Sequence, residues 1–219
     1  MDAVYAKGRR GFIPDEIYNK QVRPNMVISC GDAIVITYNG ILLGKRLNPP
    51  MQGEYWFPGG RLHKGEGLEE SIIKNVKSET GLAVEVVKGM FPVIGDTIFA
   101  VGEDRHSLNT TLIVRHVGGV PDLRKDIEAP RFINSIEADL HPYVKEILRR
   151  SGVFHPDVKE VLWSGGSEVL QNHQIPGIVR YDETDPKVAL MQIARLRESY
   201  PDAAQHELDR LKIASELRE

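Results

Sequence analysis

The sequence predicts an α/β fold in which short strands surround one central helix, a second helix closes the opposite face, and a mainly helical extension follows. Segments rich in Val and Ile alternate with turn residues over the first part of the chain, and one amphipathic helix follows a glycine turn near residue 60. A chain of 219 residues, 41% of them hydrophobic, is long enough to bury one core with a small appendage. We therefore expect a first domain at 1–151 and a C-terminal extension at 152–219.

The segment before the glycine turn predicts one short helix and three strands. Proline and two acidic residues begin the stretch 14–22, which favours a helix there. Asn39 and Gly40 are typical of a tight hairpin turn between two strands. The predicted strands are 26–38, 41–46 and 55–57.

The central helix follows the glycine turn at Gly59 and Gly60. Leu68, Ile72 and Val76 recur every four residues and form one apolar stripe. A second face carries polar side chains. The members of that face are Ser71, Asn75, Ser78 and Glu79. Gly81 is expected to end the helix as a C-cap residue.

Strands and helices also alternate after the central helix. The predicted strands are 83–87, 93–101, 109–117 and 131–133. Between them, residues 102–108 are expected to form a polar turn that carries His106, and 122–130 a charged irregular segment. Asn134 is expected to cap a helix that reaches about Arg150, and 186–199 and 201–217 are expected to form helices in the extension.

Composition excludes several classes of partner and site. The net charge of −3 gives no global basic field for nucleic acid, so we expect no nucleic-acid partner. The single cysteine, Cys30, excludes an intrachain disulfide and a metal cluster built on thiolates, and it fits a reducing compartment. No cationic start leads into an apolar run and no apolar run approaches about 20 residues, so we expect a cytoplasmic protein without a membrane partner.

The glycine turn and the central helix resemble the Nudix box. That pattern is glycine, five residues, glutamate, seven residues, then Arg-Glu-apolar-x-Glu-Glu-x-Gly-apolar. Six residues fit it at the correct spacing: Gly60, Glu66, Val76, Glu79, Gly81 and Leu82. Lys74 replaces the arginine, and Asn75 and Ser78 replace two glutamates. The resemblance implies an α/β/α sandwich with a mixed sheet and a box at 60–82.

Within that superfamily, the segment 42–61 resembles the GDP-mannose mannosyl hydrolases, a branch that also lacks box glutamates. The similarity is clear over about residues 26–82 and weaker to about residue 150. It implies Mg²⁺-dependent hydrolysis of a nucleoside diphosphate sugar, in which water attacks the anomeric carbon with inversion. Because phosphorus is not attacked, the resemblance implies that one metal ion and few carboxylates suffice.

The same resemblance implies roles for five residues. Gly59 would offer its carbonyl to magnesium and Glu79 its carboxylate. Arg46 and Arg61 would bind and neutralise the leaving diphosphate, a task that suits a permanently charged guanidinium fork. Asp32 matches an acidic residue of the catalytic layout, and a turn at the end of a strand is the alternative reading of this residue.

Two positions depart from the branch. Thr110 or Thr111 stands where the branch has a tyrosine, and Asp126 and Ile127 stand where it has a Gln-His pair. Asp126 is therefore a third candidate metal ligand, and the general base stays open, with His106 as the loop histidine to consider.

Three functions remain open at the level of the sequence. The first is a Mg²⁺-dependent nucleotide-sugar hydrolase, the second is a Nudix pyrophosphohydrolase that attacks phosphorus, and the third is a degenerate module that binds a nucleotide or a protein without turnover. The extension would pack on the core or on a second subunit in a homodimer; a lid or partner-binding element is the alternative.

Overall fold

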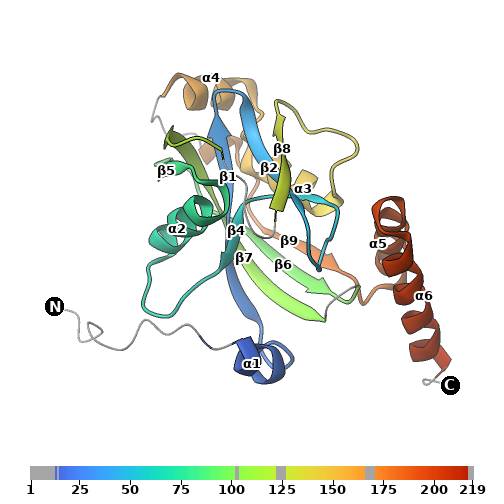
Figure 1. The fold of residues 1–219 in the computed structure, drawn as a ribbon. Helices are drawn as coiled ribbons and strands as arrows, with labels where there is room; N and C mark the ends of the chain where they lie inside the picture. The colour runs from blue at the N-terminus through green and yellow to red at the C-terminus, as the bar shows by residue number, and fades with distance from the viewer. Residues whose placement is uncertain (1–12, 14, 102–103, 122–126, 166–170, 217–219) are drawn as a thin grey trace.

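The computed structural model describes residues 13, 15–101, 104–121, 127–165 and 171–216. Within these ranges nine strands form one mixed sheet of order β3-β2-β1-β7-β6-β9, with β4 paired to β1, β5 to β7 and β8 to β2 (Figure 1). The pairs β1–β7 and β6–β9 are parallel, and the other pairs are antiparallel. The strands are β1 (Ile28–Thr37), β2 (Gly40–Arg46), β3 (Tyr55–Trp56), β4 (Gly59–Arg61), β5 (Ala83–Val86), β6 (Val93–Phe99), β7 (Arg105–Gly118), β8 (Ile127–Ile133) and β9 (Ile178–Asp182).

Helices cover both faces of this sheet, so the predicted α/β/α sandwich is confirmed (Figure 1). Alternate side chains of β1 point to opposite faces. Ala33 and Val35 pack with α2 (Leu68–Thr80) on one face. Ile34 and Ile36 pack with α3 (Pro142–Ser151) and α4 (Pro156–Ser164) on the other. The sheet is therefore buried on both sides.

The central helix α2 is fixed closely against β1. A Cβ on Gly31 would lie 2.5 Å from Cγ1 of Ile72, so the helix can approach the strand only because residue 31 has no side chain. Gly81 ends α2 in the left-handed conformation with φ of 73°, which confirms the predicted C-cap. The close packing at Gly31 and the helix end at Gly81 together fix where the last turn of α2 lies relative to the glycine strand β4.

Three predicted boundaries are wrong. The segment predicted as irregular at 122–130 is strand from Ile127, where β8 begins and pairs with Arg46 of β2. The predicted polar turn at 102–108 is half strand, because β7 begins at Arg105 and pairs with β6 as far as Phe99. The helix expected to start after Asn134 is α3, which starts at Pro142 with His141 as its N-cap. Proline favours the first helical position, and it disfavours helical geometry in the residue before it, so Pro142 decides the start.

The C-terminal extension contributes a strand as well as helices. The helices expected at 186–199 and 201–217 are confirmed as α5 (Pro186–Ser199) and α6 (Pro201–Glu216). Strand β9, which the sequence did not predict, adds to the edge of the sheet parallel to β6. Short helical turns complete the fold: α1 (Asp15–Ile17), a π-helix at Tyr18–Val22 and a 3₁₀-helix at Gln171–His173.

Polar contacts join the extension to the first domain. The guanidinium of Arg195 in α5 donates to both carboxylate oxygens of the buried Glu54, at 2.5 and 2.7 Å. Nε2 of His141 lies 3.1 Å from Oε1 of Gln192, also in α5. Among the described helices, none has the length and apolar character that crossing a membrane requires.

Candidate active site

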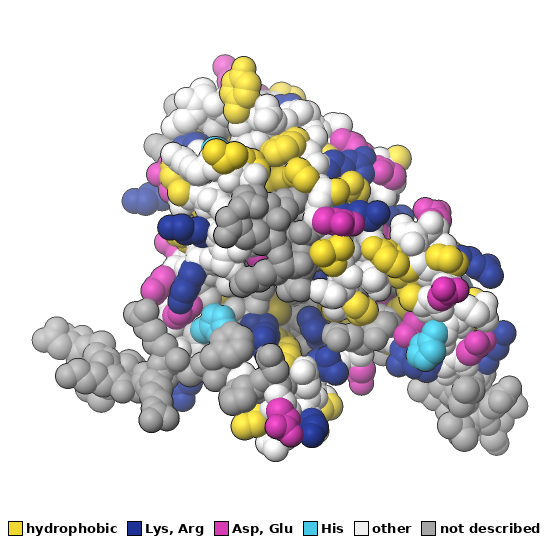
Figure 2. All heavy atoms as spheres, viewed as in Figure 1, with side chains coloured by type: hydrophobic (Ala, Val, Ile, Leu, Met, Phe, Trp, Pro, Cys, Tyr) yellow, Lys and Arg dark blue, Asp and Glu magenta, His cyan; other side chains and the backbone are white. Residues whose placement is uncertain are grey.

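A cavity of about 510 Å³ lies beside the glycine strand β4. Four arginines are among its lining residues, each from a different segment: Arg23 after the π-helix, Arg46 at the end of β2, Arg61 in β4 and Arg105 at the start of β7. Two carboxylates, Asp32 and Glu79, line it as well. Figure 2 shows basic side chains gathered around the hollow on the face of the molecule above α1. A cavity with more guanidinium than carboxyl groups favours an anionic ligand.

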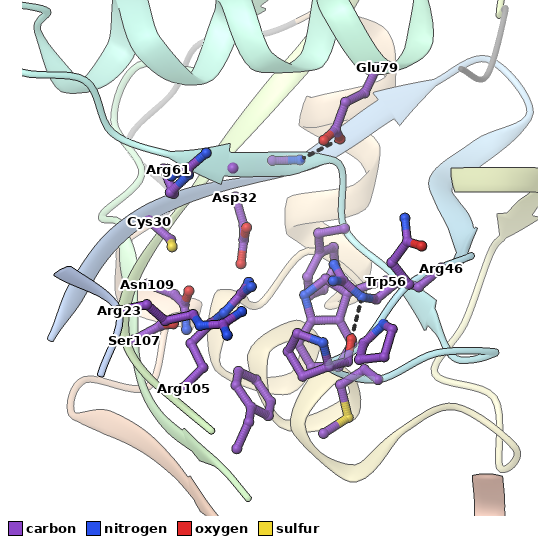
Figure 3. Close-up of a pocket in the computed structure, with 18 of the residues that line it drawn as sticks. Arg23, Cys30, Asp32, Arg46, Trp56, Arg61, Glu79, Arg105, Ser107 and Asn109 are labelled. Carbon is purple, nitrogen blue, oxygen red and sulfur yellow. Dashed lines mark hydrogen bonds between the residues drawn. The ribbon is translucent and has the colours of Figure 1, made fainter. Parts of the chain in front are cut away.

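Asp32 points from β1 into the cavity (Figure 3). The residue is buried, and within the described part of the chain its Oδ2 has no hydrogen-bond partner. The pKa of Asp32 is raised to about 7, chiefly by burial and also by the negative charge of Glu79, against the lowering effect of the nearby Arg46. A Cβ on Gly59 would lie 2.4 Å from Oδ1 of Asp32, so this position requires glycine for the two strands to pair.

Glu79 reaches the cavity from the last turn of α2. Its Oε2 accepts a hydrogen bond from the backbone N–H of Gly59 at 3.0 Å, the contact drawn in Figure 3. Asn75, one turn earlier, donates from Nδ2 to the carbonyl of Arg61 at 3.4 Å, and Ser78 is exposed. Neither Asn75 nor Ser78 lines the cavity, so α2 presents one carboxylate to it.

The remaining charged pair of the box stabilises the loop before α2. Oε1 of Glu66 lies 2.5 Å from Nζ of Lys74, and the Glu66 side chain is only 3% exposed. Neither residue lines the cavity. Lys74, which stands where the box pattern has arginine, therefore retains the charge that pairs with the buried glutamate.

Arg46 and Arg61 are held by contacts near their guanidinium groups. Nε of Arg46 donates to the carbonyl of Pro50 at 2.7 Å, and this hydrogen bond fixes the orientation of the guanidinium group. The Arg61 guanidinium carbon lies 3.8 Å from the ring centroid of the buried Tyr18, a cation–π contact that covers one face of the guanidinium. The π-helix Tyr18–Val22 thus forms part of the cavity wall.

Sequence reasoning missed Arg23 and Arg105. Arg105 lay in a segment predicted as a turn, and Arg23 immediately follows the stretch 14–22 that was predicted as a helix. In the structure Arg105, Ser107 and Asn109 alternate along β7 and all three line the cavity. This period of two was the signal that could have identified the strand and its polar face.

The cavity also contains a thiol and an apolar wall. Burial raises the pKa of Cys30 to about 12, with Asp32 contributing, so this thiol stays protonated near neutral pH and is a poor nucleophile. Trp56, Phe57 and Phe99 belong to the apolar part of the lining. Trp56 is stacked on Tyr143 at a centroid distance of 5.1 Å, so its ring is part of the core rather than a free platform.

Five of the six predicted site residues line this one cavity: Asp32, Arg46, Gly59, Arg61 and Glu79. The sixth, Asp126, lies outside the described residues. His106 does not line the cavity; it is in β7, where its Nε2 lies 2.8 Å from Oδ1 of Asp96.

Comparison with known proteins shows the family to which the chain belongs. The NUDIX domain matches residues 31–149, more than half of the chain. The Low-salt glycan biosynthesis protein Agl8 of Haloferax volcanii is 29% identical over 139 residues, which are 62% of this chain and 88% of that protein. An ADP-ribose pyrophosphatase of Methanocaldococcus jannaschii is 44% identical over 55 residues, which are 25% of this chain and 32% of that protein.

Among solved structures, a MutT NUDIX hydrolase from Burkholderia pseudomallei is 21% identical with a TM-score of 0.49, covering 57% of this chain and 97% of that chain. The family assignment depends on the domain match over residues 31–149. We conclude that the chain belongs to the Nudix hydrolase family and takes a nucleotide-type substrate.

Proposed function

We propose that the protein is a Mg²⁺-dependent hydrolase of a nucleoside diphosphate sugar of the GDP-mannose type, cleaving it at the anomeric carbon to nucleoside diphosphate and free sugar. One observation carries the proposal: the cavity combines four guanidinium groups with a box helix that contributes a single carboxylate. The guanidinium groups suit a diphosphate. One carboxylate from the helix provides too few ligands for a cluster of metal ions that would activate water for attack on phosphorus. The glycan-biosynthesis name of the Haloferax relative supports a sugar-containing substrate.

Arg46 and Arg61 are the proposed diphosphate ligands. Both line the same cavity as Asp32, Arg46 from β2 and Arg61 from β4. A guanidinium donates several parallel hydrogen bonds to phosphate oxygens and stays charged at all working pH values. Charge that develops on the leaving diphosphate would be stabilised more strongly than the charge of the ground state, which lowers the barrier to its departure.

The donor set fits magnesium. Magnesium prefers hard oxygen ligands, and the cavity lining offers the carboxylate of Glu79 and the Oδ2 of Asp32, which has no hydrogen-bond partner among the described residues. The carbonyl of Gly59 would be a third oxygen ligand. Glu79 and Gly59 would hold the ion, and Asp126 remains the third candidate ligand outside the described residues. When bound, the ion supplies positive charge to the diphosphate.

Asp32 is the proposed positioning group for the attacking water. Its buried carboxyl would accept a hydrogen bond from a water that faces the sugar, and burial among β1, β4 and β7 fixes its direction. Water adds to the anomeric carbon, the bond from that carbon to the diphosphate oxygen breaks and leaves its electron pair on the diphosphate, and the attacking water releases one proton to solvent. Attack from the face opposite to the leaving group inverts the anomeric configuration.

A second candidate is a pyrophosphohydrolase that attacks phosphorus. The 44% identity to an ADP-ribose pyrophosphatase over 55 residues favours it. It would require a base from outside α2, because Asn75 and Ser78 occupy two glutamate positions of the box and do not line the cavity.

Product analysis separates the two functions. The protein is incubated with Mg²⁺ and a panel of nucleotide sugars that includes GDP-mannose, and the products are separated by ion-exchange chromatography. We expect nucleoside diphosphate and free sugar, with the inverted anomer seen first by proton NMR. Nucleoside monophosphate and sugar phosphate would support the pyrophosphohydrolase. Nucleotide binding without any product would support a non-catalytic module and refute both enzymes.

A further inference from the structure

Two histidines and an aspartate form a cluster outside the matched domain. His155 caps α4, Asp157 lies in the first turn of α4, and His173 ends the 3₁₀-helix Gln171–His173. Oδ2 of Asp157 lies 3.7 Å from Nδ1 of His155 and 3.6 Å from Nε2 of His173. The two imidazole rings are stacked with centroids 3.9 Å apart. One ligand atom from each of the three residues lies within 4.8 Å of the others.

These separations are close to those that one metal ion requires. In a tetrahedral zinc site with bonds of about 2.0–2.1 Å, neighbouring ligand atoms are about 3.4 Å apart. The two carboxylate-to-imidazole separations, 3.6 and 3.7 Å, need to shorten by a few tenths of an ångström. Side-chain rotation provides that adjustment and also has to turn the two stacked rings away from parallel, so that a nitrogen of each points at the ion. The side chains have room to rotate, since those of His155, Asp157 and His173 are 44%, 71% and 29% exposed.

The backbone brings the ligands together independently of any ion. A Cβ on Gly152, which ends α3, would lie 2.5 Å from the carbonyl oxygen of His173, so the 3₁₀ turn packs directly on the corner between α3 and α4. The N–H of His155 donates to the carbonyl of Gly152 at 2.9 Å, and the N–H of Ile175 donates to the carbonyl of Arg150 at 3.0 Å. The ligands on both sides of the cluster are therefore fixed to the same corner, which lowers the cost of ordering them around a cation.

The donor types select a different metal from that of the cavity. Neutral imidazole suits borderline ions such as Zn²⁺, Ni²⁺ and Cu²⁺, whereas Mg²⁺ prefers oxygen donors alone. The Asp157 carboxylate offsets part of the ion's charge, and it also counters the positive end of the α4 dipole, which by itself disfavours a cation.

We propose that His155, Asp157 and His173 bind one borderline divalent transition-metal ion, with Zn²⁺ as the first candidate and water in the fourth position. The ion cross-links the start of α4 to the turn that leads into β9, and it thereby fixes this part of the C-terminal extension relative to the sheet. Because such an ion binds the folded chain and cross-links residues distant in sequence, it stabilises the fold by mass action.

Isothermal titration calorimetry with Zn²⁺ at neutral pH tests the proposal, with saturating Mg²⁺ present to occupy oxygen-donor sites. We expect one Zn²⁺ per chain, and a rise in Tm of about 5–10 °C when free Zn²⁺ is a hundredfold above Kd. His155→Gln and His173→Gln should each weaken Zn²⁺ binding at least about tenfold, because loss of a residue that merely supports a ligand already costs about 10–100-fold in metal affinity. His206→Gln, which removes an exposed histidine of α6, is the matched control and should change neither binding nor Tm shift.

Cobalt provides a second readout that a merely structural role of the histidines would not change. Co²⁺ in a four-coordinate site absorbs visible light much more strongly than octahedral Co²⁺, and this band should be present in the parent chain and in His206→Gln. It should be absent in the His155→Gln, His173→Gln double variant, whose fold is checked by circular dichroism. Absence of one-to-one Zn²⁺ binding in the parent chain, or equal binding by the double variant and the control, would overturn the proposal.

Discussion

Acidification should weaken the attachment of the C-terminal extension through one buried histidine, His141. Its Nδ1 accepts a hydrogen bond from the N–H of Tyr143 at 3.2 Å, so Nε2 carries the proton and donates to Oε1 of Gln192. Burial, together with the charges of Arg195 and Lys145 and against a raising effect of the hydrogen bond to Gln192, lowers the pKa of His141 from 6.5 to about 3. Protonation would place a charge among these cations and remove the acceptor used by Tyr143.

The magnitude follows from the difference between the folded and unfolded pKa. Because the pKa of His141 is lower in the folded than in the unfolded chain, its contribution to the free energy of unfolding is complete above pH 6.5, the pKa in the unfolded chain. That contribution is lost as the pH falls from 6.5 toward 3. Each pH unit in that window costs about 1.4 kcal/mol, so lowering the pH to about 4.5 should cost about 2–3 kcal/mol through His141 alone.

The assay is urea unfolding of the parent chain and of His141→Gln at a series of pH values from about 8 to about 4.5. Other groups titrate as well, so the quantity measured is the difference in free energy of unfolding between the two chains. Gln retains an acceptor but no titrating group; the variant should be less stable near pH 8 and should lose less stability on acidification. A difference that stays constant over this pH range would refute the buried, neutral state of His141.

Three further predictions concern the cavity and the extension. Glu79→Gln should abolish metal-dependent turnover while circular dichroism and Tm stay near those of the parent chain, because Glu79 lies on the cavity side of α2; full activity per folded molecule would contradict its role. Arg46→Ala and Arg61→Ala should each lower kcat/KM by an amount equivalent to about 2–4 kcal/mol, and losses below about tenfold for both would place the diphosphate elsewhere. A double-mutant cycle with Glu54→Gln and Arg195→Met should give a coupling of about 1–3 kcal/mol in unfolding, and a coupling near zero would mean that the ion pair does not hold α5 to the core.

The central part of the fold could be predicted because local signals and tertiary contacts agree there. Leu68, Ile72 and Val76 form one stripe at helical spacing, and the two fully buried members of that stripe, Ile72 and Val76, pack on the face of β1 that carries Ala33 and Val35. Gly59 to Glu79 is a contiguous stretch with a recognisable spacing, so the cavity residues within it were identifiable from sequence.

The missed elements depend on contacts between distant segments. Strand β9 has only five residues, and it forms because β6 offers an open edge, which no local pattern reveals. Arg105 is polar and follows other polar residues, so its strand is fixed by pairing with Phe99 rather than by its own propensity. The start of α3 was predictable in principle, since Pro142 is a stronger signal for a helix start than Asn134.

Hydrolysis of GDP-mannose in oxygen-18 water tests the central claim most directly, because it shows which atom water attacks. The protein is incubated with Mg²⁺ and the labelled water, the products are separated at once, and each is analysed by mass spectrometry, with a control in which preformed mannose exchanges under the same conditions. Attack at the anomeric carbon predicts label in the free sugar beyond that exchange and none in GDP. Label in GMP or in the sugar phosphate would contradict the account.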